Sequence, residues 1–250
     1  KYLSIFKVFR QQCLKIVPAC AEYFVDVIKD DNIYYNKETM DVSLRRTYET
    51  EKYIADTILA NVHNTNNVWD YDVENYRTVG EFKLSDEQIK ILDVVCKNNI
   101  AILNGFAGSG KTYSTKGIIN MLKSNNKTFR LFSPTGRAAK VLHENTKESA
   151  STIHRGLGYI PPNTWTYNEE HKLSCDIVIV DEFSMVDIFL MNYLVKAIYL
   201  GTKLVLVGDA NQLPSVGPGL ILNDLINSDC FTHTKLEHIY RQSDNSYIPI

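Results

Sequence analysis

The sequence lacks several features that would place a protein in a common class. It contains no apolar run near the roughly 18–20 residues that a membrane helix needs, and no signal-peptide layout. The net charge is only −2, which excludes a basic field over the whole surface but allows a local basic groove. We therefore expect no membrane role, and any role with nucleic acid has to be argued from motifs.

Cysteine and histidine are also sparse, with five cysteines and six histidines in 250 residues. The cysteines form no C-x-x-C pair and the histidines form no H-x-x-x-H pair. This pattern favours reduced thiols in the cytoplasm over a disulfide framework or a zinc site. Because the chain begins with Lys1 rather than Met, we expect a fragment.

The first 83 residues carry no motif with an obvious chemical role. Residues 1–47 predict helices followed by a short hairpin, an order typical of the end of a winged-helix unit. Residues 48–83 predict an amphipathic helix and then a polar, irregular linker. We expect a partial, mostly helical N-terminal unit joined to the rest of the chain by a connecting segment.

From residue 84 onward, expected strands and helices alternate. The helix that starts after Ser85 has Gln88 three residues on, which is the pattern of a capping box. The runs "IAIL", "IVIV" and "KLVLV" are apolar without alternation, as in strands covered on both faces. The sequence therefore predicts an α/β fold with a parallel sheet flanked by helices.

One motif, "GFAGSGKT", matches the phosphate-binding loop G-x-x-x-x-G-K-[ST] in full. It leaves an apolar strand and enters a helix, so its backbone N–H groups and the helix N-terminus can hold a polyphosphate. Lys111 is expected to reach the β- and γ-phosphates, and Thr112 to bind Mg²⁺. The predicted nucleotide-binding residues are Gln88, Gly105, Ala107, Gly108, Ser109, Gly110, Lys111, Thr112 and Tyr113.

A pair of carboxylates, Asp181 and Glu182, ends the apolar strand "IVIV" about 70 residues after this loop. In a doubly wound sheet this position places Asp181 where Mg²⁺ would bind. Glu182 can orient or deprotonate an attacking water, which predicts hydrolysis as well as binding. The sequence has neither the N-K-x-D guanine reader of GTPases nor the transporter signature LSGGQ.

Seven motifs then occur in a fixed order: "LSDEQ", "GFAGSGKT", "SPTGRAAK", "STIHRGLGY", "VDEFSMVD", "GDANQLPSVGPG" and "LEHIYRQ". In this order they resemble those of superfamily-1 DNA helicases, most of all the RecD-like branch (exodeoxyribonuclease V alpha-subunit-like). The resemblance implies a RecA-like P-loop motor domain over residues 84–250, with ATP and Mg²⁺ as cofactors. It also implies 5′-to-3′ movement on single-stranded DNA, duplex junctions as substrates and other repair proteins as partners.

The resemblance also implies roles for single residues around the nucleotide. Gln88 would read the adenine edge, which an amide can do as donor and acceptor. Arg241 would reach the γ-phosphate, although a salt bridge near the end of the chain is an alternative. The expected catalytic set is Lys111, Asp181, Glu182, Gln212 and Arg241.

Two further motifs are expected to hold the DNA strand. Hydroxyls, an exposed glycine backbone and two cations can bind phosphates, while an imidazole can stack on a base. A solvated basic helix start and a structural histidine are the alternatives. The predicted DNA-binding residues are Ser133, Thr135, Gly136, Arg137, Lys140, Thr152 and His154.

Residues 159–175 are either a small strand-separating hairpin, with Trp165 and Tyr167 on one face, or a surface loop with two packed aromatic residues. We expect the second motor domain of such helicases to be absent, so that this chain alone hydrolyses ATP poorly and does not unwind DNA. The rival functions are a P-loop ATPase switch without unwinding, an RNA helicase, and the helicase part of a relaxase.

The loop "GDANQLPSVGPG" is unusual because it combines backbone-shaping and polar residues. Its strand is expected to lie beside the one that carries Asp181. Asp209 would anchor the loop or hold the Mg²⁺ water shell, and we favour the anchor. Gln212 would face the γ-phosphate, while Pro214 and Pro218 stiffen the loop, so that it couples ATP to DNA.

Overall fold

The computed structural model describes residues 29–36, 38, 41–64, 66–228 and 230–238. The chain divides into two units, Lys1–Asp56 and Thr57–Ile250. In the first unit, β1 (Ile33–Asn36) and β2 (Asp41–Leu44) pair as an antiparallel hairpin, and α3 (Arg45–His63) begins directly afterwards. The expected hairpin is therefore present. The winged-helix expectation also involves residues 1–28, which lie outside the described residues, and it stays a prediction.

The second unit is built on a six-stranded parallel sheet with the order β12-β5-β11-β10-β6-β7. The β5 strand, which leads into the phosphate loop, lies between β12 and β11, and β10 lies between β11 and β6. The strands are β5 (Ile100–Gly105), β6 (Phe129–Ser133), β7 (Ala150–Thr152), β10 (Ile177–Val180), β11 (Lys203–Gly208) and β12 (His233–Leu236). This arrangement confirms the predicted α/β parallel-sheet fold.

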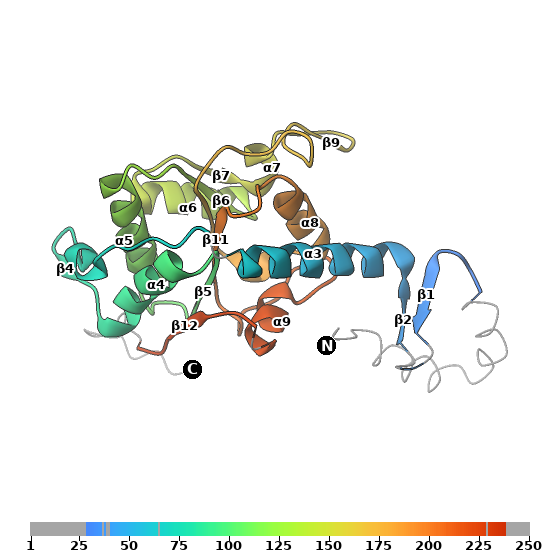
Figure 1. Ribbon diagram of the computed structural model, residues 1–250, viewed down its shortest axis with the longest axis horizontal. Helices are drawn as coiled ribbons and strands as arrows, with labels where there is room; N and C mark the ends of the chain where they lie inside the picture. Colours follow the sequence, from blue (N-terminus) through green and yellow to red (C-terminus); the bar gives the residue numbers. More distant parts are fainter. Residues whose placement is uncertain (1–28, 37, 39–40, 65, 229, 239–250) are drawn as a thin grey trace. The chain divides into compact units, whose positions relative to one another are not determined.

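Helices cover both faces of this sheet (Figure 1), and two small hairpins lie outside it. The α-helices are α4 (Asp86–Lys97), α5 (Lys111–Ser124), α6 (Gly136–Thr146), α7 (Ile153–Gly156), α8 (Ile188–Lys196) and α9 (Ile221–Asn227). Short 3₁₀ turns are η1 (Val73–Tyr76) and η2 (Phe183–Met185), and the hairpin strands are β3 (Thr78–Val79), β4 (Phe82–Lys83), β8 (Tyr159–Ile160) and β9 (Thr164–Trp165). Within the described ranges, no helix is both long and apolar enough to cross a membrane.

The main core lies between the sheet and the pair α4 and α5, which pack on one face beside each other (Figure 1). Every residue of β5, β10 and β11 is buried, which agrees with their apolar, non-alternating sequences. The α4 helix begins with the predicted capping box, in which Ser85 Oγ accepts from Gln88 N and Gln88 Oε1 accepts from Ser85 N. The core therefore holds the strand ends that carry the site in fixed register.

The segment before α4, which by composition is a linker, packs against this core. Trp69 is buried, and its backbone N–H donates to Cys96 O at 2.9 Å. Asn67 Nδ2 donates to Gly201 O at 2.7 Å. The segment is irregular, as expected, but hydrogen bonds fix it to the end of α4 and to the turn that precedes β11.

Lys203, the first residue of β11, is a buried cation with only 1% of its surface exposed. Its Nζ donates to Asn98 O at 2.9 Å and to Cys96 O at 3.2 Å, and lies 4.7 Å from the ring centre of Trp69. Burial lowers the pKa of Lys203 to about 8, while the nearby Cys96 acts in the opposite direction. The charge on Lys203 therefore lowers the stability of the folded chain.

The destabilising effect of the charged Lys203 should appear in the pH dependence of the free energy of unfolding. Between pH 8 and 10.5 the folded chain releases the Lys203 proton before the unfolded chain does, so stability rises with pH. Relative to Lys203→Met, the wild-type free energy of unfolding should rise by about 2–3 kcal/mol from pH 7 to pH 10. Urea unfolding at both pH values measures the gap, with the exposed Lys90→Met as control. A gap that does not change with pH would contradict this account.

Candidate functional site

The phosphate loop, Gly105 to Thr112, has a backbone that only glycine accommodates at several points. Gly108 and Gly110 adopt φ values of +84° and +91°, in the left-handed region. A Cβ on Gly105 would lie 2.5 Å from Ser109 Oγ, so the loop could not fold back over its own strand. The conformation that carries Lys111 into the first turn of α5 therefore depends on these glycines.

Lys111 turns its ammonium group back into this loop. Its Nζ donates to Gly105 O at 2.6 Å and to Phe106 O at 3.0 Å. Ser109 Oγ is buried and has no hydrogen-bond partner. The Lys111 ammonium group, the buried Ser109 hydroxyl and the N-terminus of α5 all belong to this loop, and this donor set fits a polyphosphate.

Asp181 and Glu182 follow β10 at the same edge of the sheet. Asp181 N donates to Phe132 O at 2.9 Å, which extends the β6–β10 pairing by one residue. Burial, and then the charge of Glu182, raises the pKa of Asp181 to about 6, and Lys111 partly offsets the shift. The carboxylate of Asp181 and the hydroxyl of Thr112 are oxygen donors of the kind that Mg²⁺ prefers, so these residues fit the predicted metal.

Glu182 itself is held in an unusual backbone conformation. Its φ of 53° and ψ of 40° lie in the left-handed region, which a residue with a side chain adopts at a cost of about 1–3 kcal/mol. The next two residues pass close to β11, because a Cβ on Gly208 would lie 3.2 Å from Ser184 N. The surrounding packing therefore maintains the strain that directs Glu182.

The loop after β11 is organised by Asp209, which is buried. Asp209 Oδ1 accepts from Asn211 N at 3.0 Å, and Oδ2 accepts from Gln212 Nε2 at 3.4 Å. Ala210 N donates to Asn104 Oδ1 at 3.0 Å, which ties the loop to β5. Asp209 thus acts as the anchor that we favoured, and β11 lies beside β10 as expected.

The Pro/Gly part of this loop is docked on the start of α8. Ile188 N donates to Pro218 O at 3.0 Å. A Cβ on Gly217 would overlap the Asp187 carboxylate, and Gly219, with φ of +105°, leaves no room for one beside Ile188. Asp187 also caps α8 by accepting from Leu190 N. Leu213 and Val216, by contrast, are exposed.

Gln88 lies between its capping box and the phosphate loop. Its Oε1 accepts from Ser85 N at 3.0 Å, and its Nε2 donates to Gly110 O at 3.4 Å. Its amide is therefore beside the N-terminus of α5, next to the loop that it was predicted to serve. Tyr113, which follows Thr112, contacts Phe82 at a ring-centre distance of 4.8 Å. Sequence reasoning missed Phe82, whose only signal was a large apolar residue in a polar turn.

The two predicted DNA-binding segments meet at one edge of the sheet, because Ser133 pairs with Thr152 in the β6–β7 register. Thr135 caps α6 by accepting from Ala138 N, and Thr152 caps α7 by accepting from Arg155 N. Gly136, Arg137, Lys140 and His154 are exposed there.

Ser133 is the exception among these residues. It is fully buried, and its Oγ has no hydrogen-bond partner. It faces the same side of the sheet as Leu131, a core residue two positions earlier in the strand. Its burial argues against the expected contact with DNA, so we remove it from the candidate set.

The segment 159–175 contains a two-stranded hairpin, β8–β9, with an aromatic cluster at its base. Trp165 stacks on Tyr193 of α8 at a ring-centre distance of 4.1 Å and also contacts Tyr159 and His154. Tyr193 Oη donates to Asn163 Oδ1 at 2.9 Å. Trp165 thus joins the hairpin to α8 and to the exposed His154. Tyr167 instead lines a separate cavity.

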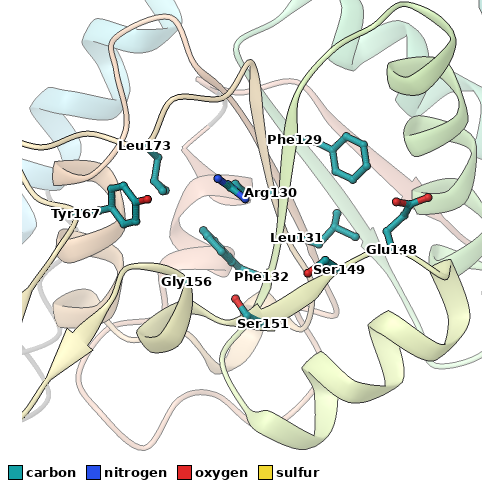
Figure 2. Close-up of a pocket in the computed structure, with 10 residues that line it drawn as sticks. All are labelled: Phe129, Arg130, Leu131, Phe132, Glu148, Ser149, Ser151, Gly156, Tyr167 and Leu173. Atoms are coloured by element: carbon teal, nitrogen blue, oxygen red, sulfur yellow. The ribbon is translucent and has the colours of Figure 1, made fainter.

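That cavity, of about 340 Å³, lies against β6 and β7 (Figure 2). Figure 2 shows Tyr167 and Leu173 on one side of Arg130, and Phe129 and Glu148 on the other. No predicted nucleotide-binding residue lines it. The cavity is therefore separate from the phosphate loop. Arg241, the remaining predicted catalytic residue, lies outside the described residues.

Comparison with known proteins identifies the family and relatives of this chain. Residues 88–218 match the family model described as AAA domain. The ATP-dependent RecD2 DNA helicase of Deinococcus radiodurans is 39% identical over 160 residues, which cover 64% of this chain and 22% of that protein. The RecBCD enzyme subunit RecD of Mycobacterium tuberculosis is 30% identical over 165 residues, which cover 57% of this chain and 29% of that protein.

A solved structure shows the same fold. The Pif1 helicase from Candida albicans matches with a TM-score of 0.50 at 24% identity, over 66% of this chain and 42% of that one. The curated relatives confirm the expected resemblance to RecD-like superfamily-1 helicases. The chain spans only 22% to 29% of the length of these two relatives.

The charge on Asp181 should cost the folded chain stability. Its pKa is about 6 rather than 3.8, so stability that is present below about pH 4 is lost as the pH rises through 6. Asp181→Asn should therefore raise the free energy of unfolding at pH 7 by about 1–3 kcal/mol, and the gain should vanish near pH 4.

Denaturant unfolding at both pH values measures this gain, and Asp70→Asn provides a control at an exposed carboxylate. Equal stability of wild type and Asp181→Asn at pH 7 would show that the carboxylate is not strained.

Proposed function

The chain belongs to the AAA domain family, and on this premise we propose that it is part of the ATP-driven motor of a RecD-like DNA helicase. The observation that carries the proposal is the meeting of three elements at the carboxyl ends of adjacent strands. These are the phosphate loop after β5, the Asp209 loop after β11 and the carboxylate pair after β10. Half-buried threonine hydroxyls and exposed cationic and imidazole groups lie at the ends of the next two strands, β6 and β7.

In the proposed reaction this chain binds ATP with Mg²⁺ and directs water to the terminal phosphate. Lys111 and the α5 N-terminus would bind the polyphosphate, and Thr112 and Asp181 would hold the metal. Bound Mg²⁺ would neutralise charge on the phosphate oxygens. Glu182, directed by its strained backbone, would orient the attacking water and accept its proton. Gln212, held by Asp209, would sense whether the γ-phosphate is present.

The second ligand that we propose is single-stranded DNA along the β6–β7 end of the sheet. Thr135 and Thr152 are helix caps, so backbone N–H groups at the start of α6 and α7 face the same region as their hydroxyls. Arg137 and Lys140 add positive charge, and His154 offers a ring for stacking. The name of the Deinococcus radiodurans relative, a DNA helicase, supports DNA as the polymer.

Finer features of the function are proposals drawn from the resemblance. They are 5′-to-3′ movement, a part in DNA repair or recombination, action at duplex junctions with other repair proteins, and a cytoplasmic location. The β8–β9 hairpin, fixed by Trp165 at its base, is a candidate for strand separation. The decisive experiment measures ATP hydrolysis by the full-length protein with and without single-stranded DNA, because a mere nucleotide switch would show no stimulation.

Removal of the Lys111 ammonium group tests the proposal that this chain binds ATP. Lys111→Ala should weaken ATP binding about 10- to 100-fold, the cost of a lost charge-assisted contact, and should abolish turnover. Isothermal titration with Mg-ATP measures binding on this chain, and Lys90→Ala, on the exposed face of α4, is the control. Undiminished affinity in Lys111→Ala would refute the assigned phosphate site.

The salt dependence of the affinity for single-stranded DNA tests the proposed DNA contacts. Arg137→Ala with Lys140→Ala should weaken binding of single-stranded DNA and reduce the slope of log affinity against log salt by about 1.4. The buried Ser133→Ala should leave both quantities unchanged, although it lies three residues before Gly136. Fluorescence anisotropy at several salt concentrations gives both values. An unaltered slope in the double variant would exclude these cations from the DNA path.

A further inference from the structure

Phe82 is an exposed aromatic residue beside the nucleotide loop, and the proposed function does not yet use it. It lies in β4, and 57% of its surface is exposed. Its ring rests on Tyr113, with centres 4.8 Å apart and planes at 54°. Tyr113 follows Lys111 and Thr112 in the first turn of α5. Its place beside the first turn of α5, which begins at Lys111, makes this exposed ring a candidate ligand contact.

The hairpin that carries Phe82 is held firmly in place beside α5 (Figure 1). Leu84 N donates to Arg77 O at 2.8 Å, and Arg77 Nη1 donates back to Leu84 O at 3.1 Å. The Arg77 guanidinium also bonds Glu74 and Asp86. These bonds fix both ends of the β3–β4 hairpin.

Close packing on α5 then sets the distance of the hairpin from the helix. Leu84 is buried against Gly117, where a Cβ would lie 2.8 Å from Leu84 Cδ1. Because Leu84 follows Phe82 by two residues, this contact brings the phenyl ring to the first turn of α5. The ring is thus positioned before any ligand arrives, which reduces the entropy lost on binding.

Gln88, in the first turn of α4, reaches the same end of α5. Its Nε2 donates to Gly110 O, at the N-cap of α5, and Phe82 contacts Tyr113 three residues further on. Lys116 Nζ lies 5.2 Å from the centre of the Tyr113 ring, a cation–π contact on the support of Phe82. The Gln88 amide, the exposed Phe82 ring and the Tyr113 phenol therefore all lie at the N-terminal end of α5, next to the phosphate loop.

We propose that Phe82 stacks on the base of the bound nucleotide, with Tyr113 as its support and Gln88 at the polar edge of the base. This inference rests on the proposed function, because it requires phosphates at Lys111. Stacking accepts every base, since each has a π-face. Phe82 therefore contributes affinity for nucleosides in general, whereas the amide of Gln88 contributes the preference for adenine.

Calorimetric titration of the 250-residue chain with ATP, GTP and inorganic tripolyphosphate separates these contributions. Phe82→Ala should weaken ATP and GTP binding by the same factor, about tenfold, and leave tripolyphosphate binding unchanged. Phe82→Tyr should retain affinity, and Phe82→Leu should lose most of it, because leucine is apolar but cannot stack. Gln88→Glu, which preserves the capping box, should instead reduce the ratio of ATP to GTP affinity.

Tyr199→Ala is the matched control, an aromatic residue with 53% exposure at the turn after α8. Equal losses for ATP and tripolyphosphate in Phe82→Ala would overturn the stacking role, as would wild-type ATP affinity in that variant. If the wild-type chain bound neither ATP nor tripolyphosphate, the proposed function itself would fall, and the stacking role with it. Binding of tripolyphosphate without any gain for ATP would overturn the stacking role alone.

Discussion

The parallel pairing of β11 between β5 and β10 is the constraint on which the rest of the site depends. Leu206 lies opposite Ile102 on one side and Val180 on the other, and this register fixes where each strand ends: β10 at this level, and β11 and β5 further on, at Gly208 and Gly105. A slip of one residue in any strand would turn its last side chains to the opposite face of the sheet. The apolar interior resists such a slip, and it thereby sets the positions of the polar groups beyond it.

Much of this arrangement could be predicted from local pattern, because burial on both faces leaves a plain apolar signature in β5, β10 and β11. The capping box of α4 was equally local. Features set by distant packing could not be read in this way. Ser133 is polar in sequence, yet its strand turns it inward beside core residues, and Trp69 anchors a segment whose composition is that of a linker. The exposure of Phe82 likewise follows from a hairpin clamped by Arg77 rather than from any motif.

The site also draws on stability that the core supplies. Glu182 keeps a left-handed backbone, and Asp181 keeps a carboxyl group whose charge is disfavoured by burial. Each costs on the order of 1–3 kcal/mol, a substantial share of the roughly 5–15 kcal/mol by which domains are stable. Strain at this strand end persists because the fully buried β11 on one side and the buried end of β6 on the other over-determine the backbone. The same rigidity holds Asp181 where its carboxylate interacts with Lys111 of the phosphate loop.

The loop after β11 links this strand end to α8 and, through α8, to the aromatic cluster of Trp165. Gln212 is tied to Asp209, the Pro/Gly segment is seated on Asp187 and Ile188, and Tyr193 of the same helix stacks on Trp165. Between the two fixed ends of the loop, Leu213 and Val216 have little packing. Movement at Gln212 would therefore be absorbed first in that stretch, and only a displacement that shifts the seat on α8 would reach the hairpin. The fit of Gly217 and Gly219 against α8, rather than the stiffness of the prolines, therefore fixes the far end of this loop.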